Sequence, residues 1–230
     1  MKLSPLCLLA AAALVLTACT SAPASSAAPE STPEPAASSE PEATSEAASE
    51  ATAAPAQDAG EDLYAGYVQD FPEVGTMATP VETEDGRTLT LECSLDNEID
   101  QLIYDHYRYE LQGDADAALA LVGDTETYRA TVESEVQNVQ QGAGCQSYTL
   151  HEMHILTPEE VQGAAPADLD LLTKEVTDSG LVQWTVQAVD LSWTYTEAEQ
   201  AKGPQLDEGR YQRYFLLGKT SDADSWKIYD

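Results

Sequence analysis

The sequence predicts an α+β domain in which N-terminal helices pack on a strongly curved antiparallel sheet, with a disordered tether before it. Residues 20–60 contain no aromatic residue and no Val, Ile or Leu, so they cannot bury enough apolar surface to fold. Apolar residues then recur every three or four positions up to Gly142, and they alternate with polar residues after Gly144. Because helices followed by a run of strands are typical of α+β proteins, residues 61–230 are expected to form one such domain, with its core in residues 95–230.

The acidic composition excludes some partners. The chain has 230 residues, with 10 basic and 41 acidic side chains and a formal net charge of −31. Nucleic acid requires a basic surface that releases counterions, and the sequence contains no basic stripe. An anionic membrane surface would repel the domain as well, so any attachment to a membrane must be covalent or hydrophobic. The acidity indicates either an ordinary solvated surface or attraction to cations and basic partners.

The first nineteen residues have the features of a cleaved secretory signal. Lys2 provides a positive charge, and residues 6–16, LCLLAAAALVL, form an apolar stretch of eleven residues that is too short to span a bilayer. The residues that follow, Leu16-Thr17-Ala18-Cys19, resemble the lipobox of bacterial lipoproteins. That resemblance implies removal of residues 1–18, a diacylglyceryl group on Cys19, and attachment to the extracytoplasmic face of a bacterial cell membrane. The alternative is a chance cysteine in an ordinary signal.

Residues 19–60 connect the expected lipid anchor to the domain. They are rich in Ala, Ser, Pro and Glu, and their prolines and like charges favour an extended, disordered chain. A flexible chain of this length spans roughly 35 Å on average. We interpret the linker as a spacer that holds the domain clear of the lipid. The alternative is a low-complexity tail whose length has no function.

The first half of the domain is predicted to contain one hairpin and three helices. Residues 61–80 show no clear period, which predicts an irregular lead-in. Asp85-Gly86 provides the turn of a hairpin in residues 81–93. The three helices are expected to begin after the N-caps Ser94 or Asp96, Asp114, and Asp124, and to end at Gly113, Gly123 and Gly142.

The second half is predicted to be a bent antiparallel sheet. In residues 145–156 and 181–195, apolar and polar residues alternate, and the phase of the alternation changes once within each stretch. A phase change inside a long strand is typical of a β-bulge, and bulges bend sheets. The segments YQRYFLLG and WKIYD, residues 211–218 and 226–230, complete the sheet.

Three segments carry a resemblance to a known family: LIYDHYRYELQGDADAALALVGD at residues 102–124, GLVQWTVQAVDLSW at residues 180–193 and DSWKIYD at residues 224–230. Their order resembles the nuclear transport factor 2-like, or cystatin-like, superfamily over residues 95–230. The early hairpin and the length of residues 157–180 depart from the usual arrangement. The resemblance implies a cone-shaped cavity between sheet and helices, in a family that includes isomerases, cyclases, hydrolases and non-catalytic modules.

Six residues are candidates for the lining of such a cone: Tyr104, His106, Tyr107, Tyr128, Trp184 and Trp193. Aromatic residues at helical or strand spacing are more often ordinary core residues, so an open cone competes with a filled one. The sequence shows no recognisable catalytic triad, phosphate loop or close pair of carboxylates.

No metal or cofactor is expected from the motifs. In HEMH, His151 and His154 are three apart on a predicted strand, whereas the helical zinc motif places two histidines four apart around a glutamate. The aspartates in residues 113–117 and 221–226 lack the central glycine and closing glutamate of a calcium loop. A helix cap and a turn explain them.

Cys93 and Cys145 are the cysteines of the predicted domain. Outside the cytoplasm an isolated pair often forms a disulfide, and closing a loop of about fifty residues would stabilise the fold by roughly 4 kcal/mol. The alternative is a pair of buried thiols.

These patterns favour a lipid-anchored cell-surface protein whose domain binds a small apolar ligand or an envelope protein without catalysis. The alternative is an isomerase- or hydratase-type enzyme that uses the cone, with Tyr104 or His106 as acid or base. A third interpretation, a solute receptor for a transporter, is disfavoured because such receptors usually need two lobes and a longer chain.

Overall fold

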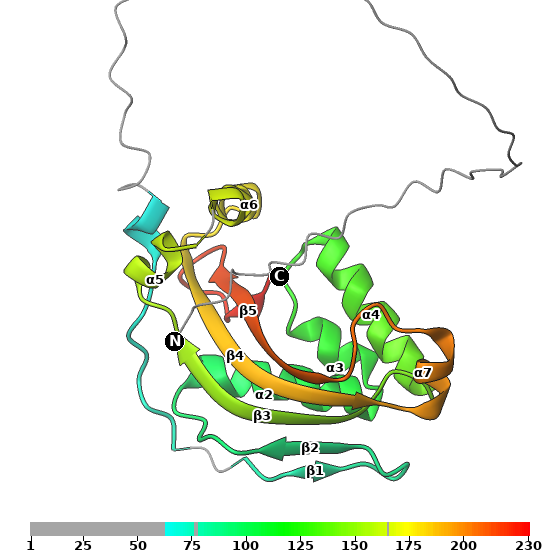
Figure 1. Ribbon diagram of the computed structural model, residues 1–230. Coiled ribbons are helices and arrows are strands. Elements are labelled where there is room, and N and C mark those ends of the chain that lie inside the picture. The colour runs from blue at the N-terminus through cyan, green and yellow to red at the C-terminus, as the bar shows by residue number, and fades with distance from the viewer. Residues whose placement is uncertain (1–62, 76–77, 165) are drawn as a thin grey trace, which may run out of the picture. The chain divides into compact units, whose positions relative to one another are not determined.

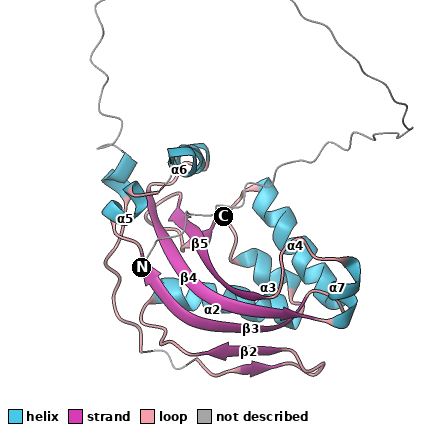
Figure 2. Ribbon diagram, viewed as in Figure 1, coloured by secondary structure: helices cyan, strands magenta, loops and turns pink. Residues whose placement is uncertain are grey.

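The computed structural model describes residues 63–75, 78–164 and 166–230. The predicted signal peptide, Cys19 and nearly all of the linker therefore lie outside the described residues. Within the described ranges, no helix is both long enough and apolar enough to cross a bilayer. The domain is α+β, as predicted, and its sheet is strongly curled around one group of helices (Figures 1 and 2).

The sheet contains six strands that lie side by side in sequence order. The strands are β1 (Val81–Glu82), β2 (Thr88–Leu91), β3 (Cys145–Ile155), β4 (Gln183–Tyr195), β5 (Gly209–Lys219) and β6 (Lys227–Ile228). Figure 1 shows that β3, β4 and β5 are long and bend together, whereas β1 and β2 form a small hairpin at one edge. The long strands therefore determine the curvature of the domain.

The prediction of an antiparallel sheet is wrong at one pair of strands. β2 runs parallel to β3, with Thr88 opposite Ser147 and Leu91 opposite Leu150, while the other neighbours are antiparallel. A parallel pair needs a long crossover connection, and the three helices between β2 and β3 provide it. The sheet is therefore mixed.

The predicted hairpin is confirmed, and its turn is tied to the rest of the domain by a buried arginine. Gly86 has a φ of 80°, the left-handed conformation that glycine adopts at little cost. Arg87 is only 2% exposed. Its guanidinium donates to the backbone carbonyls of Cys145 and Val139, and its Nε donates to Asp85 at 2.7 Å. The short strands β1 and β2 are thus fastened to the start of β3 and the end of a helix.

Three helices follow the hairpin: α2 (Glu98–Gln112), α3 (Ala115–Ala120) and α4 (Glu126–Gln140). The N-cap of α2 is Asn97 rather than Ser94 or Asp96, because Asn97 accepts from the amides of Ile99 and Asp100 in a capping box. The N-cap of α4 is Thr125 rather than Asp124.

Two of the predicted helix boundaries are confirmed. Asp114 accepts from the amide of Ala117 at the start of α3. Gly113 ends α2 with a φ of 68°.

Four further elements of the described residues were not predicted: η1 (Tyr64–Gly66), α5 (Pro158–Gln162), α6 (Pro166–Asp178) and α7 (Glu197–Lys202). α5 and α6 occupy the long segment between β3 and β4, and they lie at the opposite end of the curled strands from α4 and α7 (Figure 1). Leu172 and Val176 of α6 are buried, and their spacing of four residues places them on one face of the helix. The helices that cover the sheet therefore come from two different parts of the chain.

One of the two predicted bulges is present. In β3, Leu150 lies opposite Leu191 and Glu152 lies opposite Asp190, so His151 is an extra residue on that strand. In β4 the register with β5 is unbroken from Gln183 to Trp193, and the predicted bulge is absent.

The phase change in β4 has another cause, because helices cover its two faces at different ends. Trp184, Val186 and Ala188 belong to a buried cluster with α5 and α6. Val189, Leu191 and Trp193 belong to the main cluster with α2. Alternate residues of a strand point to opposite faces, so a change of covering helix produces the same change of phase as a bulge.

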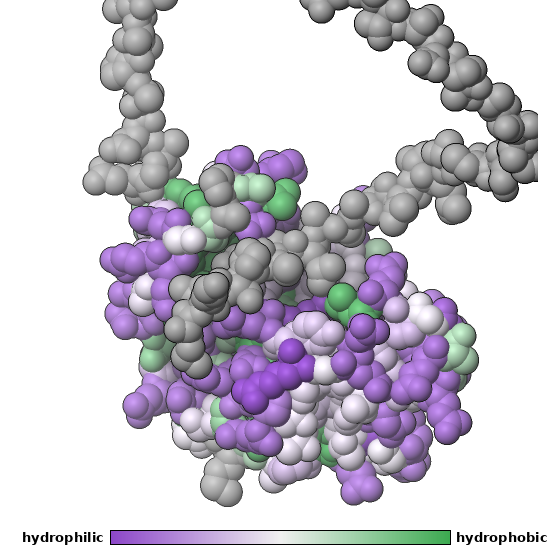
Figure 3. All heavy atoms as spheres, in the orientation of Figure 1, coloured by the Kyte–Doolittle hydropathy of each residue, from purple (hydrophilic) through white to green (hydrophobic). Residues whose placement is uncertain are grey.

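Apolar residues are mostly buried in these clusters, and a third cluster joins α3 to α4. On the face shown in Figure 3, the described residues are mainly hydrophilic, with small separate groups of hydrophobic residues. Leu171 and Val182 are the large apolar residues that remain exposed in the described part of the chain.

Candidate functional site

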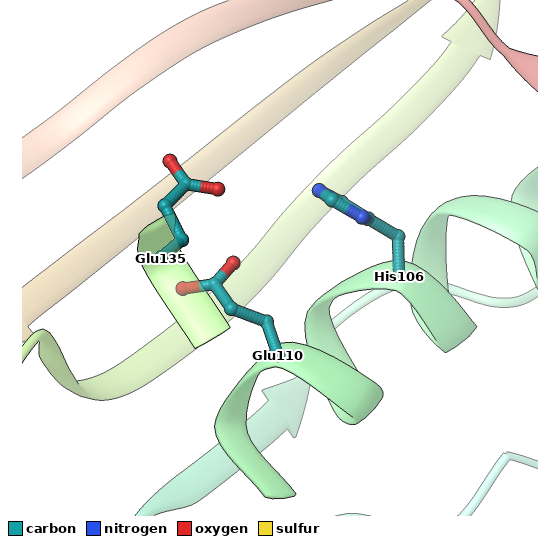
Figure 4. Close-up of side chains that lie close together, drawn as sticks. All are labelled: His106, Glu110 and Glu135. Atoms are coloured by element: carbon teal, nitrogen blue, oxygen red, sulfur yellow. The ribbon is translucent and has the colours of Figure 1, made fainter. Parts of the chain in front are cut away.

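A group of ionisable side chains lies inside the curled sheet, between α2 and α4. His106 and Glu110 come from α2, and Glu135 comes from α4. One potential ligand atom from each residue lies within 4.8 Å of the other two. Figure 4 shows the His106 ring directed toward the two carboxylates, with a ring nitrogen at its tip. We call these three residues the His–Glu–Glu cluster.

The local sequence explains why these side chains converge. His106 and Glu110 are four residues apart, so both lie on the buried face of α2 with Ile99 and Ile103. Glu135 follows Val132 by three residues and precedes Val139 by four, which places it on the apolar stripe of α4. Because α2 and α4 pack against each other, the two polar positions meet.

Polar residues of the sheet and of the C-terminus surround the cluster. Tyr148 of β3 donates its hydroxyl hydrogen to Glu110 Oε1 at 2.8 Å. Arg213 of β5 interacts electrostatically with Glu110 and Glu135, and its guanidinium lies 5.7 Å from the centre of the Trp193 ring. Asp230 also interacts with Arg213. The interior of the curled sheet is therefore charged as well as aromatic.

Burial changes the protonation of all three cluster residues. Burial raises the pKa of Glu110 to about 8, and the nearby Glu135 carboxylate contributes to the rise. Burial also raises the pKa of Glu135, against the opposing effect of Arg213. Burial, with a smaller contribution from Arg213, lowers the pKa of His106 to about 4. Burial therefore favours the neutral imidazole of His106 and the protonated form of the glutamates.

One buried polar atom of the cluster, His106 Nδ1, has no hydrogen-bond partner among the described residues. His106 is only 3% exposed. Burying a polar group without a partner costs free energy, so unpartnered groups of this kind point to a bound water, ion or ligand. Tyr128, Glu135 and Arg213 are partly exposed, so the region reaches the surface.

The structure brings together most of the six predicted lining residues. His106, Tyr107 and Tyr128 lie close to one another, with the His106 ring 5.2 Å from Tyr107 and 6.3 Å from Tyr128. Trp193 adjoins the same region through Arg213. These four residues surround a polar interior.

The other two predicted lining residues lie elsewhere. Tyr104 points to the lead-in, where its hydroxyl donates to the Thr79 carbonyl at 2.6 Å. Trp184 packs on the opposite face of β4, in the cluster beneath α5 and α6. Trp184, Val186 and Ala188 alternate along β4 and share one face of the strand. That face lies away from α2.

Sequence reasoning missed Glu110, Glu135 and Arg213 as site residues, and it found no close pair of carboxylates. The sequence did contain one signal for these residues: each is a charged residue at a position where the helix or strand period predicts an apolar one. Arg213 alternates with Phe215 and Leu217, which are both buried. The pairing of Glu110 with Glu135 depends on how α2 packs against α4, and no local pattern contains that information.

Two hollows lie outside this region. The first, of about 290 Å³, is lined by Glu152, His154, Asp190, Arg210, Tyr211 and Gln212. Arg210 and Asp190 form a two-point ion pair there, at 2.7 and 2.8 Å. The second is a small apolar slot between α5, α6, β4 and β5. Among the described residues, neither His151 nor His154 belongs to a group that could hold a metal ion.

The predicted disulfide is not formed, because both Cys93 and Cys145 are free. Cys93 lies just beyond β2, and its Sγ is 3.7 Å from the Leu150 carbonyl oxygen. Cys145 begins β3, five residues before Leu150, which corresponds to about 16 Å along a strand. A disulfide requires Cα atoms roughly 4.4–6.8 Å apart. The parallel pairing of β2 with β3 therefore separates the two thiols.

We expect reducing agents to leave the stability of this protein unchanged. Denaturation in iodoacetamide should modify Cys93 and Cys145 to the same extent with and without prior reduction, because neither sulfur is in a bridge. Peptide mass spectrometry measures this directly. Modification of these two residues only after reduction would contradict the structure.

Comparison with known proteins identifies no relative: no family model, no curated protein and no solved structure matches this chain. The described features therefore define an α+β domain with a curled, mixed, six-stranded sheet and a buried His–Glu–Glu cluster. The proposals below depend on these features and on the sequence.

Proposed function

We propose that this protein is a lipid-anchored protein of the extracytoplasmic face of a bacterial membrane, and that its folded domain is a binding module. The anchor is supported by the apolar segment 6–16 followed by Leu16-Thr17-Ala18-Cys19, and by the polar linker that follows. The linker would give the domain room to reach a ligand or partner away from the lipid surface.

One observation supports the binding function above the others. His106 Nδ1 is buried without a hydrogen-bond partner among the described residues, and the ring faces the carboxylates of Glu110 and Glu135. A folded protein rarely keeps such a group unless something else satisfies it. The ligand is accordingly polar or cationic, because an apolar molecule would leave His106 Nδ1 without a partner.

The cystatin-like fold is part of this proposal. A curled sheet closed on one side by α2, α3 and α4 supports it. The parallel hairpin strand β2 and the helices α5 and α6 are additions to that arrangement. We propose that they extend the sheet and cover its second face.

A second candidate function is an isomerase- or hydratase-type enzyme. A protonated Glu110 beside Glu135 and a neutral His106 offers both a proton donor and a proton acceptor within one buried site, which is the observation that favours acid–base chemistry. Tyr104 has no part in this version, since its hydroxyl is bound to the Thr79 carbonyl.

Replacement of the lipidated cysteine tests the anchor. In cells that express the full chain, Cys19→Ser should abolish incorporation of labelled palmitate and release the protein from the membrane fraction, because the acyl chains attach to that sulfur. Cys7→Ser, in the same signal segment, is the matched control and should leave labelling intact. Equal labelling of wild type and Cys19→Ser would remove the anchor from the proposal.

Native mass spectrometry of the full chain, extracted from its own membrane, tests the binding function. The wild-type protein should retain a non-covalent ligand or ion that Glu135→Gln loses, because Glu135 is one of the three cluster residues. Glu133→Gln, on the exposed side of the same helix, should keep it. A ligand-free mass for the wild type, together with turnover of a hydroxy acid or enone panel, would favour the enzyme instead.

A further inference from the structure

We propose that the His–Glu–Glu cluster is a site for one divalent transition-metal ion, with zinc as the best match. His106, Glu110 and Glu135 would be its protein ligands. This inference rests on the proposed binding function, since it names the ligand of the same site. No sequence motif indicates it, because its three ligands come from two helices that meet only in the folded domain.

The donor set fits zinc. Imidazole nitrogen and carboxylate oxygen are both zinc ligands, at about 2.0–2.2 Å, so two ligand atoms in a tetrahedral site lie about 3.4 Å apart. The three candidate atoms lie within 4.8 Å of one another. Zinc binding would therefore draw the side chains together by about 1 Å. Three protein ligands leave a fourth position open for water or a further ligand.

His106 provides an independent indication of a bound cation. The ring is buried, its Nδ1 has no hydrogen-bond partner among the described residues, and Figure 4 shows the ring directed toward the two carboxylates. A hydrogen bond from a glutamate or from Tyr107 would satisfy the ring, yet none is formed. A metal ion bound between the ring and the carboxylates would give the imidazole a partner within the cluster.

The charges around the cluster also favour a divalent cation. Glu110, Glu135 and Asp230 place three carboxylates around Arg213. A bound divalent ion would add positive charge beside these acidic groups. Arg213 would also repel the metal, and it therefore limits the affinity of the site.

Glu110 is already oriented by a neighbour, as metal ligands usually are. The Tyr148 hydroxyl donates to Glu110 Oε1 at 2.8 Å, which holds the carboxylate and leaves Oε2 available. Tyr148 comes from β3, so the curled sheet would support a ligand that a helix provides.

The experiment uses the full chain in detergent, stripped of metal with a chelator and then titrated with zinc chloride in a calorimeter. One zinc ion per chain should bind, and cobalt chloride should produce visible absorption bands that zinc displaces. Glu135→Gln and His106→Gln should each weaken zinc binding on the order of 100-fold or more, because each removes one of only three ligands. Glu133→Gln and His154→Gln, which replace exposed residues, should bind as the wild type does.

A folding control keeps the test decisive. Glu135→Gln removes one of two adjacent buried carboxylates, so the metal-free variant should melt no lower than the metal-free wild type. Zinc should raise the melting temperature of the wild type, of Glu133→Gln and of His154→Gln, and should change that of Glu135→Gln much less.

Absence of saturable zinc and cobalt binding by the wild type would overturn the metal site, as would equal losses in Glu133→Gln and Glu135→Gln. In that case the two glutamates and His106 would be titratable groups that bind no metal ion. A retained organic ligand in the native mass spectrum would then leave the binding function standing without the metal, and a ligand-free mass would remove both.

Discussion

Arg213→Met should lower the free energy of unfolding by about 2–3 kcal/mol at neutral pH. Arg213 lies beside Glu110, Glu135 and Asp230, and it lowers the pKa of each against the effect of burial. Its removal leaves carboxylates in a buried site without this neighbouring cation. Breaking a fully buried ion pair typically costs about 3–5 kcal/mol, and the smaller figure applies because Arg213 is partly exposed.

Urea unfolding followed by circular dichroism measures this loss, and two further variants identify its cause. Arg210→Met is the matched control on the same strand: it breaks the exposed ion pair with Asp190 and should leave stability unchanged within error. Adding Glu135→Gln to Arg213→Met should recover part of the stability, because glutamine needs no counter-charge. Equal effects of Arg213→Met and Arg210→Met would contradict an electrostatic role for Arg213.

Trp184→Ala is expected to have the largest effect of any single substitution considered, a loss of about 3–5 kcal/mol. Trp184 is 1% exposed and is central to the cluster beneath α5 and α6. Its ring lies 5.6 Å from the Tyr64 ring and 4.7 Å from the Tyr67 ring. Its Nε1 donates to the Leu63 carbonyl at 3.2 Å. The substitution therefore creates a cavity and releases the lead-in.

Val182→Ala, two residues earlier in the chain, is the matched control because Val182 is 49% exposed. It should change stability little. Limited proteolysis provides a second measurement: cleavage near residues 63–68 should accelerate in Trp184→Ala and stay at the wild-type rate in Val182→Ala. If the lead-in stays protected while the domain loses stability, then Trp184 contributes to the core without fastening the lead-in.

Much of the secondary structure could be predicted because its signals are local. The turn at Asp85-Gly86, the helix end at Gly113 and the cap at Asp114 each depend on a few neighbouring residues, and each is confirmed. The helices α5 and α6 were missed because the segment was interpreted as an insertion. The apolar faces of these two helices are buried against β4, which follows them in the chain.

The missing bulge in β4 illustrates where local patterns mislead. The change of phase between Ala188 and Val189 is real, but it reflects which helix covers each face of the strand. A bulge and a change of cover produce the same alternation in a sequence. Only the unbroken register with β5 distinguishes them.

The sequence by itself determined the acidic character of this protein, its polar linker composition, its short-range turns and caps, and the periods of its helices and strands. Each of these follows from residue type and from neighbours within a few positions. The tertiary structure alone decided the parallel pairing of β2 with β3, the separation of Cys93 from Cys145, and the meeting of His106, Glu110 and Glu135. These features join segments that are far apart in the chain, and their geometry depends on how the helices pack inside the curled sheet.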